Sequence, residues 1–190
     1  MVSLARVMDT DHPWPEPLRR MPDGTVKQIN PYSGTSVWTV PGRGNRPLAS
    51  GLPAPGPIDP AQEGRHCAFC EGRYFDTPPE KARLVADPDG WHLLRAVQAD
   101  RLEESVAQFR RIPNLFEIVA YDYWRLNYGF EPGREAREHH DSYLSTERGR
   151  AHVHAMVRTR AMAGGMSEAQ WAALSGPELA QRAMSFFAGT

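Results

Sequence analysis

The sequence predicts an α+β protein, with strands in its N-terminal part and a mainly helical C-terminal segment. Two observations support this prediction. Before residue 130, short runs that hold β-branched residues alternate with loops rich in proline and glycine. After residue 130, the pattern of apolar and polar residues is helical almost to the end of the chain.

Composition limits the classes of function. The chain has 190 residues, of which 41% are hydrophobic and 24% charged, so it is ordinary globular material able to bury a core. A formal net charge of −1 gives no basic excess for binding nucleic acid. No apolar run resembles a signal peptide or approaches the roughly 20 residues needed to cross a membrane. We therefore expect a cytoplasmic protein without nucleic-acid or membrane partners, in which disulfides are disfavoured.

Four segments are predicted as strands. The first two, 25–31 (TVKQINP) and 35–41 (TSVWTVP), flank the turn-forming residues PYSG. The stretch 41–60 holds six prolines and is expected to be an extended surface loop. The other two predicted strands are 91–97 (WHLLRAV) and 115–121 (LFEIVAY).

Three segments carry the signature of a helix start. In TPPE (77–80), the Thr77 hydroxyl can accept a backbone N–H while Glu80 reaches back, and Pro78 suits the first helical position. The segments 167–170 (SEAQ) and 175–178 (SGPE) repeat this capping-box pattern. We therefore expect helices to begin at all three places.

The last predicted helix has an apolar face that must pack on something. Its members are Leu179, Ala183, Phe186 and Phe187. Because the chain stops shortly afterwards at Thr190, one interpretation is that more chain follows in a longer protein. The other interpretation is a helix docked on its own domain, and the sequence pattern favours neither.

The segment RHCAFCEGRYFDTPPE (65–80) holds the only two cysteines, Cys67 and Cys70. A C-x-x-C pair can bind one metal ion from a tight knuckle, and Gly72 is available for the turn. A redox pair instead needs a helix that starts at the first cysteine. Here the predicted helix start follows the pair, which weakens that reading, and two buried thiols remain the alternative.

No histidine is selected by spacing as a further metal ligand. The candidates are His66, His92, His139, His140, His152 and His154. In AHVHAM (151–156), two histidines lie two residues apart, which on a helix places them about 200° apart, so both cannot face one metal. His139 and His140, in a charged helical segment, are interpreted as solvated side chains.

Three segments together resemble galactose-1-phosphate uridylyltransferases, which belong to the histidine-triad superfamily of nucleotidyl transferases and hydrolases. They are NPYSGTSVWTVPGRGNRP (30–47), CAFCEGRYFDTPPE (67–80) and WHLLRAV followed by RRIPNLFEIV (91–119). Their order and rough spacing agree with that family. The resemblance covers about residues 24–120 and then fades.

The resemblance implies an antiparallel sheet surrounded by helices and a zinc ion on Cys67 and Cys70. It divides the chain into an N-terminal arm (1–23), a uridylyltransferase-like part (24–124) and a helical segment (125–190). The implied partners are a nucleotide sugar and a sugar phosphate. Since some members of the family build their site across a dimer interface, the resemblance also allows a homodimer.

The resemblance assigns substrate-binding roles to four residues. It places Asn114 and Phe116 against the nucleoside, and Arg43 and Arg46 near the phosphates or the sugar. Two guanidinium groups three residues apart can both bind an anion, and an amide can both donate to and accept from a ribose hydroxyl. Without the neighbouring motifs, the same residues read as surface arginines and an ordinary turn.

The sequence departs from that family at the nucleophile. The family uses the central histidine of a His-x-His-x-Gln motif, but here Met156 stands where the glutamine belongs after HVH. We therefore expect a non-catalytic N-terminal part of a nucleotidyltransferase, with the other zinc ligands outside these residues. The alternatives are a non-catalytic zinc-knuckle binding or assembly module and a redox protein.

Overall fold

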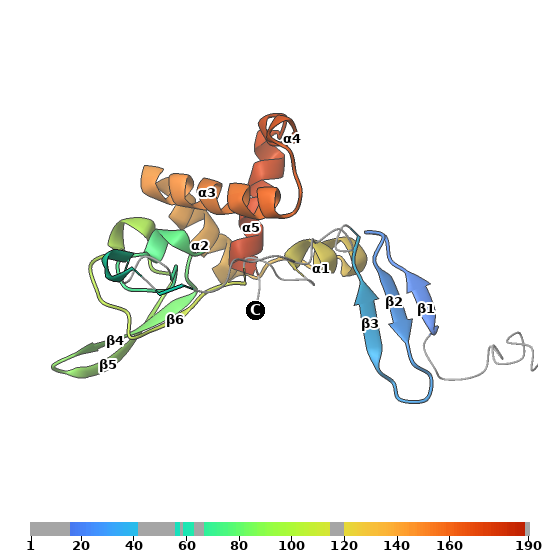
Figure 1. Cartoon of the computed structure of the whole chain (residues 1–190), viewed down its shortest axis with the longest axis horizontal. Helices are drawn as coiled ribbons and strands as arrows, with labels where there is room; N and C mark the ends of the chain where they lie inside the picture. Colours follow the sequence, from blue (N-terminus) through green and yellow to red (C-terminus); the bar gives the residue numbers. More distant parts are fainter. Residues whose placement is uncertain (1–15, 42–55, 58, 63–66, 115–119, 189–190) are drawn as a thin grey trace, which may run out of the picture. The chain divides into compact units, whose positions relative to one another are not determined.

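Two small antiparallel sheets precede five α-helices in the part of the chain that the structure describes (Figure 1). The structure is a computed structural model that describes residues 16–41, 56–57, 59–62, 67–114 and 120–188. The chain divides into two compact units, Met1–Ser50 and Gly51–Thr190. The predicted α+β class is thus confirmed.

The first unit contains a three-stranded sheet in the order β1-β2-β3. Its strands are β1 (Leu18–Arg20), β2 (Val26–Ile29) and β3 (Ser36–Thr39), all antiparallel to their neighbours. The two strands predicted in this region are confirmed. β1 was not predicted, because its sequence LRR has no β-branched residue and lies in the stretch assigned to the arm.

The predicted turn between β2 and β3 is also confirmed. The Asn30 side-chain oxygen accepts a hydrogen bond from the Tyr32 N–H at 2.9 Å, and the Asn30 backbone N–H donates to the Thr35 carbonyl at 2.9 Å. Gly34 takes a left-handed conformation with a φ of 69°, which most other residues avoid. Most of the predicted proline-rich loop lies outside the described residues.

The second unit begins with the sheet β5-β4-β6, which comprises β4 (Ala82–Asp87), β5 (Gly90–Arg95) and β6 (Phe109–Arg111). The predicted strand over 91–97 corresponds to β5. Because β6 pairs with the first half of β4 only, the far half of the β4–β5 hairpin extends away from the helices (Figure 1). Residues 115–119 of the fourth predicted strand lie outside the described residues, and Tyr121 begins a helix.

Helices fill the segment predicted to be helical after residue 130, and a further helix, α1, precedes it and was not predicted. They are α1 (Tyr121–Tyr128), α2 (Arg134–Ser145), α3 (Glu147–Ala163), α4 (Glu168–Ala172) and α5 (Gly176–Ala188). None of the helices in the described ranges is long and apolar enough to cross a membrane.

Of the three predicted capping boxes, the one before α4 is complete, and only half of the one before α5 is formed. Before α4, the Gln170 N–H donates to the Ser167 hydroxyl at 3.2 Å, and the Ser167 N–H donates to the Gln170 side chain at 2.8 Å. Before α5, the Ser175 N–H donates to the Glu178 carboxylate at 2.8 Å. These local hydrogen bonds satisfy backbone groups that a helix start otherwise leaves unpaired.

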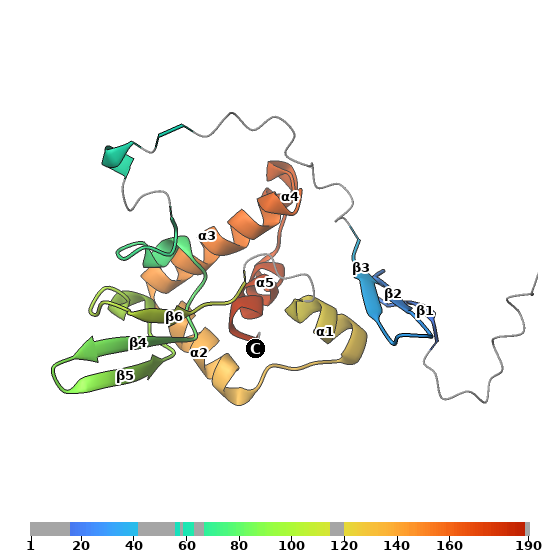
Figure 2. The same ribbon diagram turned by 60° about the horizontal axis from the view of Figure 1, so that its bottom comes forward.

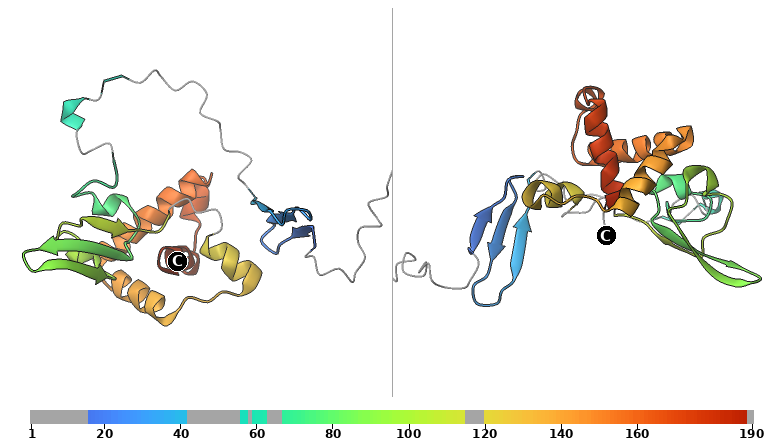
Figure 3. Two further views of the ribbon diagram at one scale, coloured as in Figure 1. Left: turned by 90° about the horizontal axis from the view of Figure 1, so that it is seen from below. Right: turned by 180° about the vertical axis from the view of Figure 1, so that it is seen from behind.

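The main core of the second unit lies between α2, α3 and α5, with the 3₁₀-helices η4 (Tyr74–Asp76) and η5 (Ala99–Arg101) beside it (Figure 2). Its buried members include Ala99, Tyr143, Val153, Met156, Val157, Ala183, Phe186 and Phe187. Seen along its axis in the left view of Figure 3, α5 lies beside α2 and α3. The apolar face predicted for the last helix is thus covered by this chain's own helices.

The connection between α2 and α3 is a single residue long. Thr146 alone separates the two helices, and its hydroxyl accepts the Gly149 N–H at 3.0 Å as the N-cap of α3. This tight turn brings the α2 backbone onto α3. A Cβ atom on Gly149 would lie 1.8 Å from the Tyr143 carbonyl oxygen, so only glycine fits there.

Gly149→Ala should therefore destabilise the protein, because α2 and α3 must separate to admit the methyl group. We expect a loss of about 1–3 kcal/mol in the free energy of unfolding, measured by urea denaturation. Gly176→Ala, where a Cβ meets no atom within 4 Å, is the matched control and should cost nothing. Equal stability of the two variants would contradict this account of the connection.

Candidate functional site

The two cysteines form the knuckle that their spacing predicts. The Cys70 N–H donates to the Cys67 carbonyl at 3.2 Å, the Arg73 N–H donates to the Cys70 carbonyl at 3.2 Å, and Gly72 has a φ of 74°. Both thiols are free and half-buried. The sulfur atoms of Cys67 and Cys70 therefore belong to one short loop.

The redox reading finds no support in this geometry. Partial desolvation raises the pKa of the Cys70 thiol, the adjacent Cys67 thiol raises it further, and Arg73 only partly opposes the change. A redox pair needs the opposite shift and a helix beginning at the first cysteine. The nearest helical turn, η4, instead begins at Tyr74.

The described residues do not complete a metal site around the knuckle. No group of three or more His, Cys, Asp or Glu side chains among them is arranged to hold a metal ion. His92 is committed to the Asp87 carboxylate at 3.0 Å, and His66 lies outside the described residues. The two thiols are thus what this part of the chain offers to a metal.

The predicted helix start at TPPE is wrong. Residues 78–80 are extended and lead into β4, and the Thr77 hydroxyl donates back to the Tyr74 carbonyl at 3.2 Å instead of accepting a forward N–H. Glu80 does not reach back to Thr77, because its carboxylate is fully buried against Arg83 and Arg110. The capping box that the local sequence pattern predicts does not form, because Glu80 is paired with buried arginines instead.

Glu80 is the centre of a buried charge cluster. Its carboxylate accepts from the Arg83 Nε and, at 3.1 Å, from the Arg83 Nη2, while Arg110 Nε donates to it at 2.7 Å. The side chains of Glu80 and Arg83 are both 0% exposed and that of Arg110 is 9% exposed. Burial of charged groups this complete requires mutual pairing, which the cluster provides.

Other donors of the two guanidinium groups bind backbone and hydroxyl oxygens, while Arg110 Nη1 is buried without a hydrogen bond to the described residues. Arg83 Nη1 donates to the Leu102 carbonyl at 2.7 Å and to the Ser105 carbonyl at 2.9 Å. Arg110 Nη2 donates to the Thr77 hydroxyl at 3.0 Å. The Tyr74 ring lies between both cations, 4.6 Å from the Arg83 Cζ and 4.7 Å from the Arg110 Cζ. The cluster therefore fastens the segment after the knuckle to β4 and β6.

His152 is buried, and no local pattern in the sequence indicates its partners. Its Nε2 lies 2.7 Å from the Thr77 carbonyl, which can only accept, so Nε2 carries the proton. Its Nδ1 therefore accepts from the Tyr143 hydroxyl at 2.7 Å. Burial lowers the pKa of His152 and raises that of Tyr143, so both are neutral. This chain of hydrogen bonds joins α2 and α3 to the segment before β4.

The HVH motif behaves as its spacing predicts. His152 faces the core, while His154 is exposed, with its ring centroid 5.1 Å from that of Trp171. The two imidazoles therefore lie on different faces of α3. With both ring nitrogens engaged, His152 is a structural residue.

The interpretation of His139 and His140 as solvated side chains is wrong. The His139 ring packs edge-on against Tyr143 and Phe187, at centroid distances of 5.7 and 5.0 Å, and the His140 ring lies 5.3 Å from Phe187. Burial lowers the pKa of His139 from 6.5 to about 4. The charged residues beside these histidines in the sequence predict solvent exposure, but the packing of α2 against α5 places both rings against aromatic side chains.

The predicted substrate-binding residues are only partly described. Asn114 is exposed and lies three residues beyond the end of β6. Arg43, Arg46 and Phe116 lie outside the described residues. Because Arg110 of β6 is bound to Thr77 and Glu80, the strand that leads to Asn114 and the segment that follows the cysteines are joined in one structure.

Fold and site thus define an α+β protein with a cysteine knuckle fastened to a small antiparallel sheet. Residues 21–190 match the family described as a domain of unknown function, DUF4921, and the chain belongs to this family. No curated protein and no solved structure shows a significant match to the chain.

Glu80→Gln should destabilise the protein strongly, because Arg83 and Arg110 would remain buried without their counter-charge. We expect a loss of about 3–5 kcal/mol in the free energy of unfolding, measured by urea denaturation followed by circular dichroism. The control is Glu104→Gln, which removes the exposed 2.8 Å pair with Arg101 and should cost about 0–1 kcal/mol. Similar losses for the two variants would show that the cluster does not stabilise the fold.

His139 should make stability depend on pH. Because its pKa falls from 6.5 to about 4 on folding, the unfolded chain binds more protons between these values. The free energy of unfolding should therefore fall as the pH is lowered from 6.5 to 4, and His139→Phe should flatten this dependence. His154→Gln, on the exposed face of α3, should leave it unchanged. An unaltered pH dependence in His139→Phe would contradict the assignment.

Proposed function

We propose that this chain is a nucleotide-sugar-binding part of a nucleotidyltransferase similar to galactose-1-phosphate uridylyltransferases. In this proposal Cys67 and Cys70 supply two ligands of a zinc ion, and Asn114 lies against the nucleoside. The observation that carries it is the link from Arg110 to Thr77 and Glu80, at 3.0 and 2.7 Å.

That link matters because it joins two motifs that are distant in the sequence. The segments 67–80 and 110–114 both resemble the same family, and no local pattern connects them. The Arg110 side chain holds them together in a desolvated cluster, where an ion pair is least screened by solvent. Motifs that belong to one ligand site must meet in space, and these two segments do.

The donor set fits half of a zinc site. Structural zinc takes four ligands in a tetrahedron, and a C-x-x-C knuckle commonly provides two sulfur ligands. The described residues add no further ligand at the knuckle. Zinc bound by Cys67 and Cys70 would hold the knuckle in shape, and the proposed ligand binding does not depend on any chemistry of the metal.

The exposed Asn114 side chain suits a nucleoside, since its amide both donates and accepts hydrogen bonds. Arg43 and Arg46 are proposed to bind the phosphates, because guanidinium groups pair bidentately with phosphate oxygens. Phe116 is proposed to cover the nucleoside. These roles follow the resemblance. Arg43, Arg46 and Phe116 lie outside the residues that the structure describes.

His152, the first histidine of the HVH motif, is not placed to act as a nucleophile. His152 has both ring nitrogens in hydrogen bonds at 2.7 Å, and a nucleophilic imidazole needs one nitrogen exposed to the phosphate. This observation favours a second candidate function, a non-catalytic zinc-knuckle module for binding or assembly. The two candidates differ in whether a nucleotide sugar binds.

Calorimetry with UDP-glucose, together with metal analysis of freshly purified reduced protein, tests the proposal. We expect saturable binding, bound zinc that Cys67→Ser releases, and a loss of about 1.5–3 kcal/mol in binding free energy for each charge-assisted bond removed by Arg43→Ala and Arg46→Ala. Arg101→Ala, which removes only an exposed pair with Glu104, is the control. Zinc without UDP-glucose binding would select the assembly module, and the absence of both would reject the two candidates.

A further inference from the structure

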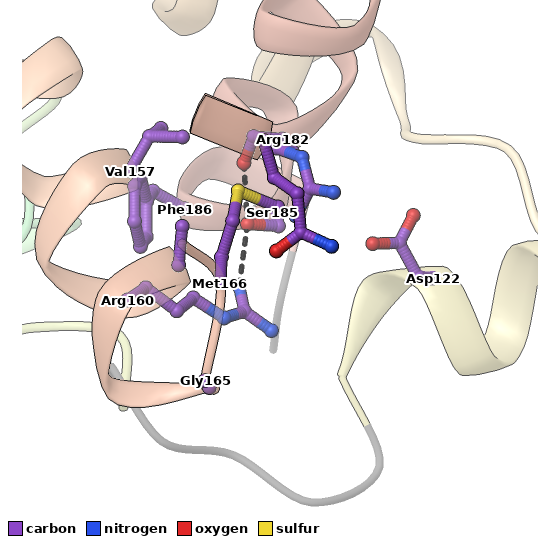
Figure 4. Close-up of a pocket in the computed structure, with 11 residues that line it drawn as sticks. Asp122, Val157, Arg160, Gly165, Met166, Arg182, Ser185 and Phe186 are labelled. Carbon is purple, nitrogen blue, oxygen red and sulfur yellow. Dashed lines mark hydrogen bonds between the residues drawn. The ribbon is translucent and has the colours of Figure 1, made fainter. Parts of the chain in front are cut away.

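The helical half contains a cavity of about 380 Å³ that the proposed function does not use (Figure 4). It lies between the C-terminal end of α3, the loop before α4, α4 itself and the middle of α5, with α1 opposite. None of its lining residues belongs to the knuckle, the buried charge cluster or the β5-β4-β6 sheet. Its size falls within the about 300–1,000 Å³ typical of small-molecule pockets.

Two arginines from different helices form a basic wall. Arg160 of α3 donates from Nη1 to the Ser185 hydroxyl at 2.7 Å, and that hydroxyl donates to the Arg182 carbonyl at 2.6 Å. Ser185 is buried, so this relay fixes the Arg160 guanidinium at the edge of the cavity. Figure 4 shows Arg182 in the upper part and Arg160 in the lower part of the view, both across the space from Asp122.

Arg182 differs from the other cations of these helices. Arg158 pairs with Glu168, and Arg148 pairs with Glu103, but the Arg182 side chain makes no hydrogen bond or ion pair with any residue in the described ranges. Glu178, the acidic residue one turn earlier on α5, is held by Ser175, although the charge of Arg182 also helps to lower the pKa of its carboxyl. A half-buried guanidinium that lines a cavity and makes no hydrogen bond or ion pair with the described residues can bind a ligand.

The opposite side of the cavity accepts hydrogen bonds. Asp122 of α1 lines it, with one carboxylate oxygen accepting from the Gln181 side chain at 3.0 Å. Gln170 of α4 adds an amide that can donate or accept. The apolar part of the lining comes from Val157 and Phe186. Among the described residues of the lining, two guanidinium groups and one carboxylate give an excess of positive charge.

We propose that this pocket binds a small phosphorylated polyol. The phosphate pairs with Arg182, since a guanidinium group binds phosphate oxygens through two parallel N–H donors, and Arg160 adds positive charge to the same lining. The hydroxyl groups of the ligand donate to Asp122 and exchange hydrogen bonds with Gln170, while its carbon chain contacts Val157 and Phe186. The charges on the two walls therefore orient the ligand, with its phosphate toward α3 and α5.

Titration calorimetry of the whole 190-residue chain with glycerol 3-phosphate, inorganic phosphate and glycerol tests this proposal. We expect saturable binding of glycerol 3-phosphate, weaker binding of inorganic phosphate, which lacks the hydroxyls, and no binding of glycerol. Arg182→Gln should weaken glycerol 3-phosphate binding at least 10-fold. Arg158→Gln is the matched control, because Arg158 lies on α3 but pairs with Glu168 outside the cavity, and it should leave the affinity unchanged.

The outcomes separate this site from the proposed function. Arg182→Gln should leave UDP-glucose binding unaltered, and Arg43→Ala should leave glycerol 3-phosphate binding unaltered. The proposal is overturned if glycerol 3-phosphate does not bind, if inorganic phosphate binds as tightly, or if Arg158→Gln weakens binding as much as Arg182→Gln. A variant that has lost its fold is recognised by circular dichroism and replaced by Arg182→Lys, which should also bind more weakly because it cannot pair bidentately.

Discussion

The Glu80 carboxylate, buried between the guanidinium groups of Arg83 and Arg110, is the interaction on which the second unit depends. An unpaired charge at this depth would cost several kcal/mol, so each of the three side chains requires the other two. Arg83 belongs to β4 and Arg110 to β6, while Glu80 ends the segment that follows the cysteines. The pairing therefore fixes the position of the knuckle segment on the sheet.

The same segment also holds the helices. The Thr77 hydroxyl accepts from Arg110, and its carbonyl accepts from His152 of α3, which in turn binds Tyr143 of α2. One residue thus connects the sheet, through β6, with two helices of the core. Since His152 and Tyr143 are both neutral, this connection needs no counter-charge, unlike the pair beside it.

The two proposed ligand sites lie in separate regions of the second unit. The knuckle segment and Asn114 are both connected to the β5-β4-β6 sheet, and a sheet can hold loop residues in a fixed geometry for binding. The cavity around Arg160 and Arg182 is built on helices and the loop before α4, and Ser185 of α5 positions the Arg160 guanidinium. The first region was indicated by motifs and the second only by geometry, because Arg160 and Arg182 are distant in the sequence and lie in no motif.

The sequence by itself determined the features that depend on neighbours within one turn or one hairpin. These include the α+β class, the strands around the PYSG turn, the capping box at Ser167 and the opposed faces of His152 and His154.

The tertiary structure alone decided the backbone conformation of Thr77–Glu80 and the burial of His139. The pattern TPPE satisfies the local rules of a helix start, but Arg110, 30 residues further on, stabilises the extended form by pairing with Glu80. His139 has charged neighbours in the sequence and an aromatic partner, Phe187, that only the packing of α5 supplies. Interactions between distant residues carry no signal in a local pattern, and they outweigh local preference wherever burial makes an unpaired group costly.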